Sequence, residues 1–509
     1  MGGNLAPDYL VARFRITAMN RDSTMMKRIP LITSLLAVVV GIWAKLELTS
    51  GELLPGLDGA YYWVQVRSVL NNFTLAFSDL PLVFWIQAAI AKVVGNVTLG
   101  VRVSDAVLPA LSAIPIYLIA KKYKNPVLPA IAILVVLLHP VQLYFFTGDF
   151  IKNEATIPVV FFMALVLVNW DKRSKRFSII SLLALTLVIA ISHFGTLLLA
   201  FMLVGTWALL QLRKSGLNFW LRGIAFSIVA FAELLGVLAV LVPSRFDRLI
   251  NFLTTPTVIF QSPALDRILH SPSPSVMTIA IIIGQLGTLI LAAITWSARS
   301  RFSFSDMSLV IASLFTTFIF SSPLIGMEWS DRLTGLSIVS LSIAAIIIFG
   351  SVESLWHKAP IALLAAVTLF TAIPLSTMEM KRVFSDQEYS DFKDFASHVS
   401  IPSNSVMVAR HGVEYLSAWE FSADVVLDTY YESADLSSYS SVYYIQELKT
   451  FTPGGGGKGD GTKPSEPPTG KGPSGKGGKP DAPTDLPKKT AITGETIYSS
   501  SSFALVKVR

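Results

Sequence analysis

The sequence predicts an α-helical polytopic membrane protein that carries a small α/β domain at its C-terminal end. Of its 509 residues, 52% are hydrophobic and only 15% are charged, whereas about 25% of the residues of a soluble domain are charged. Long apolar runs recur between Pro30 and Ser376, and each approaches the roughly 20 residues that cross a bilayer as a helix. The runs do not alternate with polar residues, so membrane-spanning helices are expected instead of barrel strands.

The apolar runs predict about eleven transmembrane helices within a membrane domain at residues 29–377. The predicted spans are residues 30–48, 102–120, 126–146, 155–170, 177–193, 196–212, 219–242, 275–297, 303–322, 331–350 and 359–377.

The apolar run from Leu82 to Gly95 is predicted to lie in the outer interface without crossing the membrane. It is too short for a comfortable span and contains Lys92. With this run outside the bilayer, the basic turns between the later spans fall on the same side as Lys27 and Arg28, as the positive-inside rule requires. The prediction is therefore a multi-pass plasma-membrane protein with a cytoplasmic N-terminal segment, 1–28, and a first outer loop, 49–101. The basic turns are Lys121/Lys122/Lys124, Lys172/Arg173/Lys175/Arg176, Arg213/Lys214 and Arg299/Arg301.

Residues 378–509 are predicted to form an extracytoplasmic α/β domain, because an odd number of spans separates them from the N-terminal segment. The stretch 453–489 is rich in Gly, Pro and Lys and is expected to be a disordered insertion in that domain. The expected elements are helices at Gln387–Val399 and His411–Phe421 and strands at Ser405–Ala409, Asp424–Asp428, Ser441–Gln446 and Ser502–Val508.

Composition and motif content exclude several classes of protein. The chain has no cysteine, so it has no disulfides and no cysteine-based metal site or nucleophile. The net charge of +7 resides largely in short turns and in the Lys-rich stretch, so it does not indicate a nucleic-acid partner. Phosphate-binding glycine loops, HExxH and nucleophile elbows are absent from the sequence. Asn72-Phe-Thr and Asn96-Val-Thr fit the short N-glycosylation pattern on the outer side.

The first outer loop contains a carboxylate directly before a helix-like run, Asp58 in Pro55-Gly-Leu-Asp-Gly-Ala-Tyr-Tyr-Trp63. A carboxylate in that position accepts backbone N–H bonds and is favoured by the helix dipole. Asp58 is therefore either a plain helix N-cap or a functional acid.

A second outer loop, Thr147–Glu154, crowds Asp149, Lys152, Asn153 and Glu154 between two apolar spans. Ionisable groups at membrane depth are functional candidates by default, although polar residues at a membrane boundary also serve as ordinary interfacial loop residues.

Three further positions carry chemistry and also have simpler structural explanations. His193 is a site candidate or an interhelical hydrogen-bonding residue. Arg332 has the planar fork that suits a phosphate, or it pairs locally with Glu328 or Asp331. For His411 and Glu414 the pattern favours a role in capping or packing a helix.

The order of these motifs resembles the GT-C superfamily of membrane glycosyltransferases, which use lipid-phosphate-linked sugars. The resemblance covers roughly residues 27–450. The Trp-Trp-Asp-Tyr-Gly motif of oligosaccharyltransferase catalytic subunits is absent, which weighs against en bloc transfer onto asparagine. The likeness rests on Asp58; on Tyr61, Tyr62 and Arg67; on Asp79-Leu-Pro-Leu; on Gly148-Asp149; on Ser192-His193-Phe-Gly; on Arg332; and on Ala409-Arg-His-Gly-Val-Glu-Tyr415.

The resemblance implies an inverting transfer of a sugar from a polyprenyl- or dolichyl-phosphate donor to a protein, glycan or lipid acceptor. Asp58 would be the base and Asp149 the second acid. Some members bind a divalent metal and others do not, so Mg²⁺ or Mn²⁺ held by Asp58, Asp149 and Glu154 is left open. Arg332, Lys152 and Arg67 would face the donor phosphate, and the remaining site candidates are Tyr61, Tyr62, Asp79, Glu154 and His193.

Two other functions remain open from the sequence. A transporter or flippase of lipid-linked material would show internal repeats and broken polar helices near the membrane midplane. A non-catalytic scaffold would leave the acidic loops far apart. Convergence of Asp58, Asp149 and Arg332 on one outward cavity separates the enzyme from the scaffold.

Overall fold

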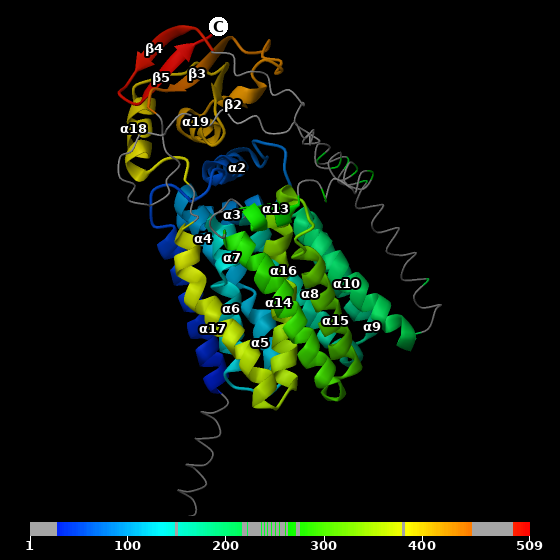
Figure 1. Ribbon diagram of the computed structural model, residues 1–509. Helices are drawn as coiled ribbons and strands as arrows, with labels where there is room; N and C mark the ends of the chain where they lie inside the picture. The colour runs from blue at the N-terminus through cyan, green and yellow to red at the C-terminus, as the bar shows by residue number, and fades with distance from the viewer. Residues whose placement is uncertain are drawn as a thin grey trace, which may run out of the picture.

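The computed structural model describes residues 28–147, 151–215, 275–378, 382–449 and 492–509, with scattered positions between 221 and 270. These residues form a bundle of long helices with a smaller sheet-containing domain above one end, and α2 (Gly59–Asn72) lies between the two (Figure 1). The predicted fold class, a polytopic helical membrane protein with a C-terminal α/β domain, is confirmed.

Eight described helices are long and apolar enough to cross a membrane, against about eleven predicted. Two predicted spans are shorter helices, α9 (Lys175–Ala190) and α15 (Phe304–Phe320), and the predicted span 219–242 lies almost wholly outside the described residues. The long helices are Arg28–Leu48, Val97–Lys121, Leu128–Phe145, Ile151–Val168, Phe194–Gln211, Val276–Ser297, Trp329–Ser351 and Leu355–Ala372.

Proline residues accompany breaks in two of these long spans. The span Val97–Lys121 consists of α4 (Val97–Ala110) and α5 (Ala113–Lys121), with Pro109 inside the end of α4. The span Leu128–Phe145 consists of α6 (Leu128–Leu137) and α7 (Pro140–Thr147). Proline lacks the backbone donor that continues a helix. The other bundle helices are α8 (Ile151–Val168), α10 (Phe194–Ser215), α13 (Ala264–His270), α14 (Val276–Ser297), α16 (Met327–Ser351) and α17 (Leu355–Met378).

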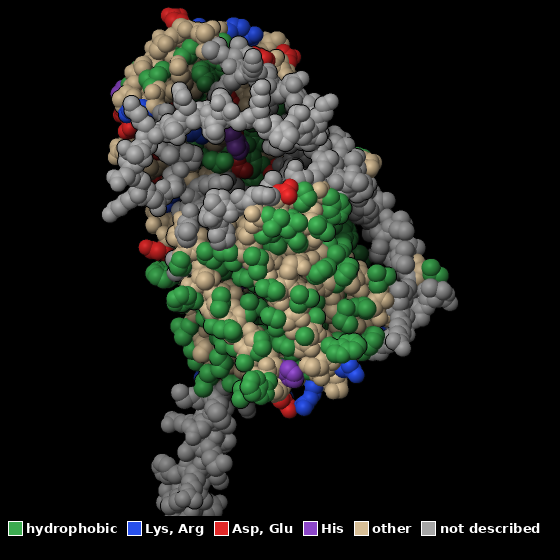
Figure 2. Space-filling view, in the orientation of Figure 1, with side chains coloured by type: hydrophobic (Ala, Val, Ile, Leu, Met, Phe, Trp, Pro, Cys, Tyr) green, Lys and Arg blue, Asp and Glu red, His purple; other side chains and the backbone are tan. Residues whose placement is uncertain are grey.

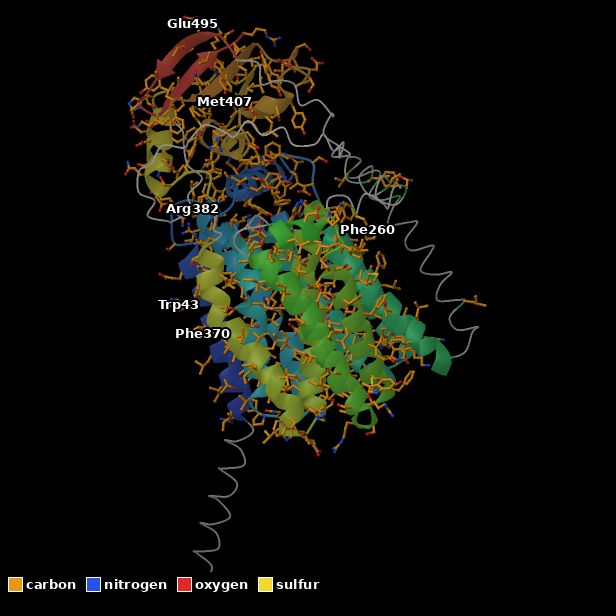
Figure 3. All side chains as sticks on the ribbon, viewed as in Figure 1. Trp43, Phe260, Phe370, Arg382, Met407 and Glu495 are labelled. Atoms are coloured by element: carbon orange, nitrogen blue, oxygen red, sulfur yellow. The ribbon has the colours of Figure 1, made fainter. Side chains whose placement is uncertain are left out.

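The flank of the bundle is apolar and suited to lipid. Trp43 on the first helix and Phe370 on α17 lie on this flank (Figure 3) and expose 60% and 86% of their surface. Hydrophobic side chains cover the side of the bundle, and charged ones gather at its ends (Figure 2). The distribution is that of a bundle solvated by hydrocarbon around its middle.

The short basic turns come together at the bundle end opposite the C-terminal domain. Lys122 after α5 donates to Asp306 at the start of α15, with a 2.6 Å N–O distance. Arg301, between α14 and α15, contacts Glu353, between α16 and α17, at 2.9 Å. The basic clusters used in the orientation prediction therefore share one end.

The predicted interfacial run is α3 (Leu82–Val94), a helix of 13 residues near the other end of the bundle (Figure 1). It packs along α2 and α4 and ends at Gly95, whose φ of 76° terminates it in the left-handed region. Its length is well below the ~20 residues of a span.

The C-terminal domain is a five-stranded sheet in the order β2-β1-β3-β5-β4. The central pairs β1–β2 and β1–β3 are parallel, and β5 pairs antiparallel with both β3 and β4. The two strands that follow residue 491 thus rejoin the sheet begun before the Gly/Pro/Lys-rich stretch, and that stretch itself lies outside the described residues. The elements are α18 (Asp386–Ser397), β1 (Ser405–Ala409), α19 (Val413–Phe421), β2 (Asp424–Leu427), β3 (Ser441–Glu447), β4 (Glu495–Ser499) and β5 (Phe503–Lys507).

The C-terminal domain and the first outer loop share one hydrophobic core. Trp63 of α2 is 1% exposed and lies 5.6 Å, ring centre to ring centre, from Trp419 of α19. Gly56 forms an isolated parallel bridge with Arg382, which lies at the junction of bundle and domain (Figure 3). Burial of this shared apolar surface holds the domain over the loop that contains Asp58.

Candidate functional site

Asp58 lies where the first outer loop enters α2, directly beneath the C-terminal domain. It occupies the N-cap position of α2, but its side chain makes no capping hydrogen bond. The carboxylate faces the C-terminal domain, and Asp58 Oδ1 is 3.8 Å from His411 Nε2. The simple N-cap explanation of Asp58 therefore does not account for its side chain.

His411 reaches Asp58 because the loop before α19 makes a tight turn at Gly412. Gly412 has a φ of 89°, and a Cβ there would come within 2.9 Å of Val383 Cγ2, so a side chain would strain the backbone and collide. His411 also contacts Glu414, with 2.9 Å between Nδ1 and Oε1. Glu414 is almost fully buried, with its side chain 3% exposed, whereas the His411 side chain is 53% exposed.

A second carboxylate, Asp79, is held below Asp58 by Lys152 and Tyr61. Lys152 forms an ion pair with Asp79 Oδ2, and the Tyr61 hydroxyl donates to the same oxygen at 2.5 Å. Gln65 donates to the Tyr61 hydroxyl at 2.9 Å. The structure thus brings three predicted site residues, Asp79, Lys152 and Tyr61, into one cluster.

Charges from several elements act on Asp58 together. Burial raises the pKa of Asp58, and the positive charges of His411, Lys152 and Arg332 oppose that rise, while Asp79 adds to it. Arg332 lies in the second turn of α16 and is exposed. The acid and two of the predicted phosphate-binding cations thus interact at one end of the bundle. Figure 2 shows histidine and acidic side chains in the hollow between the bundle and the C-terminal domain.

The predicted three-oxygen metal site does not form among the described residues. Glu154 is 1% exposed, and its Oε1 accepts from Lys45 of the first helix at 2.6 Å. Within the described part of the chain, no group of three or more His, Asp or Glu residues is arranged to hold a metal ion. Asp149 lies outside the described residues. The assignment of Glu154 as a metal ligand is therefore wrong on the geometry described: its partner is a lysine.

Arg67, predicted to bind the donor phosphate, instead fastens α2 to α19. Its two terminal nitrogens donate to the carbonyl oxygens of Ala418 at 2.6 Å and Trp419 at 2.7 Å. Its guanidinium also lies 4.6 Å from the centre of the Trp419 ring. Arg332 and Lys152 remain as the phosphate-binding candidates.

We expect Arg67→Ala to loosen the C-terminal domain without unfolding the bundle. Loss of two charge-assisted hydrogen bonds should weaken the docking by about 3 kcal/mol. Amide hydrogen exchange in α19 should rise markedly, while exchange in α8 and α16 stays unchanged. The matched control is Lys393→Gln, which removes an exposed ion pair with Glu52 across the same junction and should cost less than about 1 kcal/mol. Equal exchange in the two variants would contradict the docking role.

His193 and Tyr62 have structural partners of their own. His193 Nδ1 accepts from the backbone N–H of Thr196 at 3.2 Å at the start of α10, and Thr196 contacts Thr156 of α8 at 2.7 Å. The predicted role of His193 in linking helices thus has a direct counterpart. Tyr62 is 2% exposed, and burial raises its pKa well above the ordinary value, so it serves as a neutral packing residue.

The sequence interpretation assigned His411 and Glu414 to helix packing and missed their place in the site. The cap residue of α19 is Gly412, so neither side chain is needed as a cap. A histidine before a glycine, followed three residues later by a glutamate, was the available signal. Only the docking of the domain on α2 shows that this histidine faces Asp58.

Comparison with solved structures finds similar chain arrangements in membrane glycosyltransferases. The chain is similar to the Archaeoglobus fulgidus oligosaccharyltransferase tethered with an acceptor peptide, at 13% identity and a TM-score of 0.48, covering 81% of this chain and 69% of that one. It is also similar to ArnT from Cupriavidus metallidurans in the apo state, at 13% identity and a TM-score of 0.46, covering 84% and 93%. No family model matches the chain, and no curated protein matches it. Both neighbours are of the GT-C type that the sequence motifs resemble, and at this identity the likeness concerns the fold alone.

Proposed function

We propose that the protein is a membrane glycosyltransferase that moves a sugar from a polyprenyl-phosphate donor to a hydroxyl or amide acceptor outside the cytoplasm. The observation that carries the proposal is the arrangement around Asp58. A partly buried carboxylate is influenced by Lys152 and Arg332 at the bundle end next to the C-terminal domain. A base and cations are what a displacement at a sugar–phosphate bond requires.

The proposed reaction divides the work between the acid and the cations. Asp58 removes the acceptor proton as the acceptor attacks the anomeric carbon, and the bond from that carbon to the phosphate oxygen breaks. The lipid phosphate leaves with the bonding electrons, so negative charge grows on it. Arg332 offers a planar fork of donors and Lys152 a compact charge, and both offset that growing charge.

Helix polarity supports a phosphate in this region. Lys152 is in the first turn of α8, and Arg332 is near the start of α16. The positive ends of these helices favour an anion near their first turns. The leaving group and the helix ends therefore have complementary charge.

The proposed orientation places this site on the outer side. The basic turns at the opposite end, including the Lys122 and Arg301 turns, mark the cytoplasmic face under the positive-inside rule. The C-terminal domain then lies outside the cytoplasm, beside the outer leaflet. The proposal derives no step through a metal ion, because the described oxygen ligands do not form the predicted set.

Arg332→Gln is expected to reduce transfer from an undecaprenyl-phosphate hexose by about 10²-fold in kcat/KM, the effect of removing one donor that stabilises developing charge. Arg332→Lys should recover part of the loss because it keeps the charge but not the fork. Release of undecaprenyl phosphate in detergent, with a panel of hexoses, measures both. The matched control is Arg382→Gln, an arginine of the junction that pairs with Asp386 at 3.4 Å. Equal activity in Arg332→Gln and the wild type would contradict the phosphate-binding role.

A further inference from the structure

We propose that His411 and Glu414 of the C-terminal domain form a proton relay with Asp58, so that this domain supplies part of the acid–base machinery. The proposal rests on the proposed function for the role of Asp58. It gives the C-terminal domain a chemical task in addition to any binding of the acceptor.

The hydrogen bond between His411 and Glu414 determines which ring nitrogen faces Asp58. Glu414 Oε1 lies 2.9 Å from His411 Nδ1, and an ionised carboxylate only accepts hydrogen bonds, so Nδ1 carries the hydrogen. In the neutral ring the lone pair is then on Nε2. That nitrogen is the one that lies 3.8 Å from Asp58 Oδ1, so His411 presents an acceptor to Asp58.

The 3.8 Å separation suits a transfer that follows substrate binding. It is beyond hydrogen-bond range, so Asp58 is not permanently bonded to His411 through these atoms. A movement of about 1 Å, or one bridging water, brings the two into contact, and catalytic hydrogen bonds often tighten only in the substrate complex.

The exposure of the three side chains gives the relay a direction. Glu414 is 3% exposed, Asp58 36% and His411 53%. The buried Glu414 fixes the ring, and burial raises its pKa while the His411 hydrogen bond opposes that rise. The exposed His411 can exchange its proton with water. A proton taken by Asp58 therefore has a route to solvent through His411.

The relay closes the proton balance of the proposed reaction. After transfer, Asp58 holds the proton that came from the acceptor. Passing it to His411 Nε2 restores the carboxylate and creates an imidazolium, whose charge Glu414 offsets. His411 then gives the proton to water, and the enzyme returns to its starting state.

The other charges around the relay are accounted for. Lys152, Arg332 and Asp79 act on Asp58. Arg410, next to His411 in the chain, donates to both oxygens of Glu447 at 2.7 and 2.8 Å. That bidentate pair offsets the charge of Arg410 on the β3 side of the loop.

Glu414→Gln is the sharpest test, because an amide can donate to Nδ1 and so move the ring hydrogen to Nε2, which removes the acceptor facing Asp58. We expect Glu414→Gln and His411→Asn to lower kcat about 10²-fold with little change in KM. We expect added imidazole to restore part of the kcat of His411→Ala, since the side chain is half exposed. The matched control is His398→Asn, an exposed histidine of the same domain that lies 3.9 Å from Asp394, and it should retain wild-type kcat.

A second measurement does not depend on activity. Carbethoxylation of each histidine is followed against pH by mass spectrometry in the wild type, Asp58→Asn and Glu414→Gln. The pH of half-maximal reaction at His411 should fall in both variants, because each removes a negative neighbour, while His398 reacts as before.

The outcomes separate the relay from the proposed function. If Asp58→Asn is inactive while His411→Asn and Glu414→Gln keep full kcat, the relay is wrong and the proposed function stands. If no donor supports transfer but His411 responds to Asp58→Asn, the proposed function falls and the Asp58–His411 coupling stands. An unchanged carbethoxylation profile in both variants overturns the relay in either case.

Discussion

Asp58→Asn is expected to lower kcat for sugar transfer by about 10²- to 10⁴-fold, the usual effect of removing a general base. The substitution keeps size and polarity and removes only the ability to hold the acceptor proton. The fold should be unaffected, because the side chain makes no capping hydrogen bond to α2. The thermal midpoint of the variant should therefore match the wild type, which separates lost chemistry from lost structure.

The matched control for this variant is Glu52→Gln, an acid in the same loop whose exposed side chain pairs with Lys393. It changes the charge of the loop by the same amount and leaves the site alone, so it should retain wild-type kcat. Full activity in Asp58→Asn, or an equal loss in both variants, would remove Asp58 from the catalytic role.

The same assignment predicts a pH dependence with a definite sign. Burial raises the pKa of Asp58, against the opposing charges of His411, Lys152 and Arg332. A base works only when deprotonated, so kcat/KM should fall as pH decreases through this raised pKa. The acid limb should therefore lie above the ordinary carboxyl value of 3.8. Arg332→Gln removes one opposing charge and should move the limb to higher pH.

The membrane architecture could be predicted because it depends on local composition. Continuous apolar runs of span length identify the helices, and the short run with Lys92 identifies α3 as a helix of 13 residues. The count was less secure, because α9 and α15 are shorter than the eight long helices. In the C-terminal domain, β4 was missed because Glu495–Ser499 alternates weakly and has an exposed pattern, unlike the fully buried β1.

The candidate site could be predicted only in part, because its contacts join distant segments. Asp58, Asp79 and Lys152 were found from loop position and charge, without their pairing. Sequence position alone does not place Lys45 against Glu154, 109 residues later, or place His411 over Asp58. Arg67 looked like a phosphate ligand until its donors were found on the carbonyl oxygens of α19.

Lys45→Met is expected to destabilise the membrane domain by about 3–5 kcal/mol, the cost of leaving one partner of a buried ion pair uncompensated. Lys45 and Glu154 are each 1% exposed, so water cannot solvate the remaining carboxylate. Glu154 follows Lys152 by two residues on α8, so loosening this end of the helix should also lower transfer activity. Chemical denaturation of the purified protein in detergent, followed by helical circular dichroism, measures the change.

Two further variants test the cause of that loss. Lys45→Met combined with Glu154→Leu removes both charges and should recover most of the stability, because well-packed apolar residues often replace a buried ion pair at little cost. Lys122→Met breaks an equally short pair with Asp306, but the Lys122 side chain is 24% exposed, so its loss should be much smaller, near the roughly 1 kcal/mol of surface pairs. Failure of the double variant to recover would mean that the pair contributes net attraction. The charge of Glu154 would then be required at the start of α8 for more than its own neutralisation.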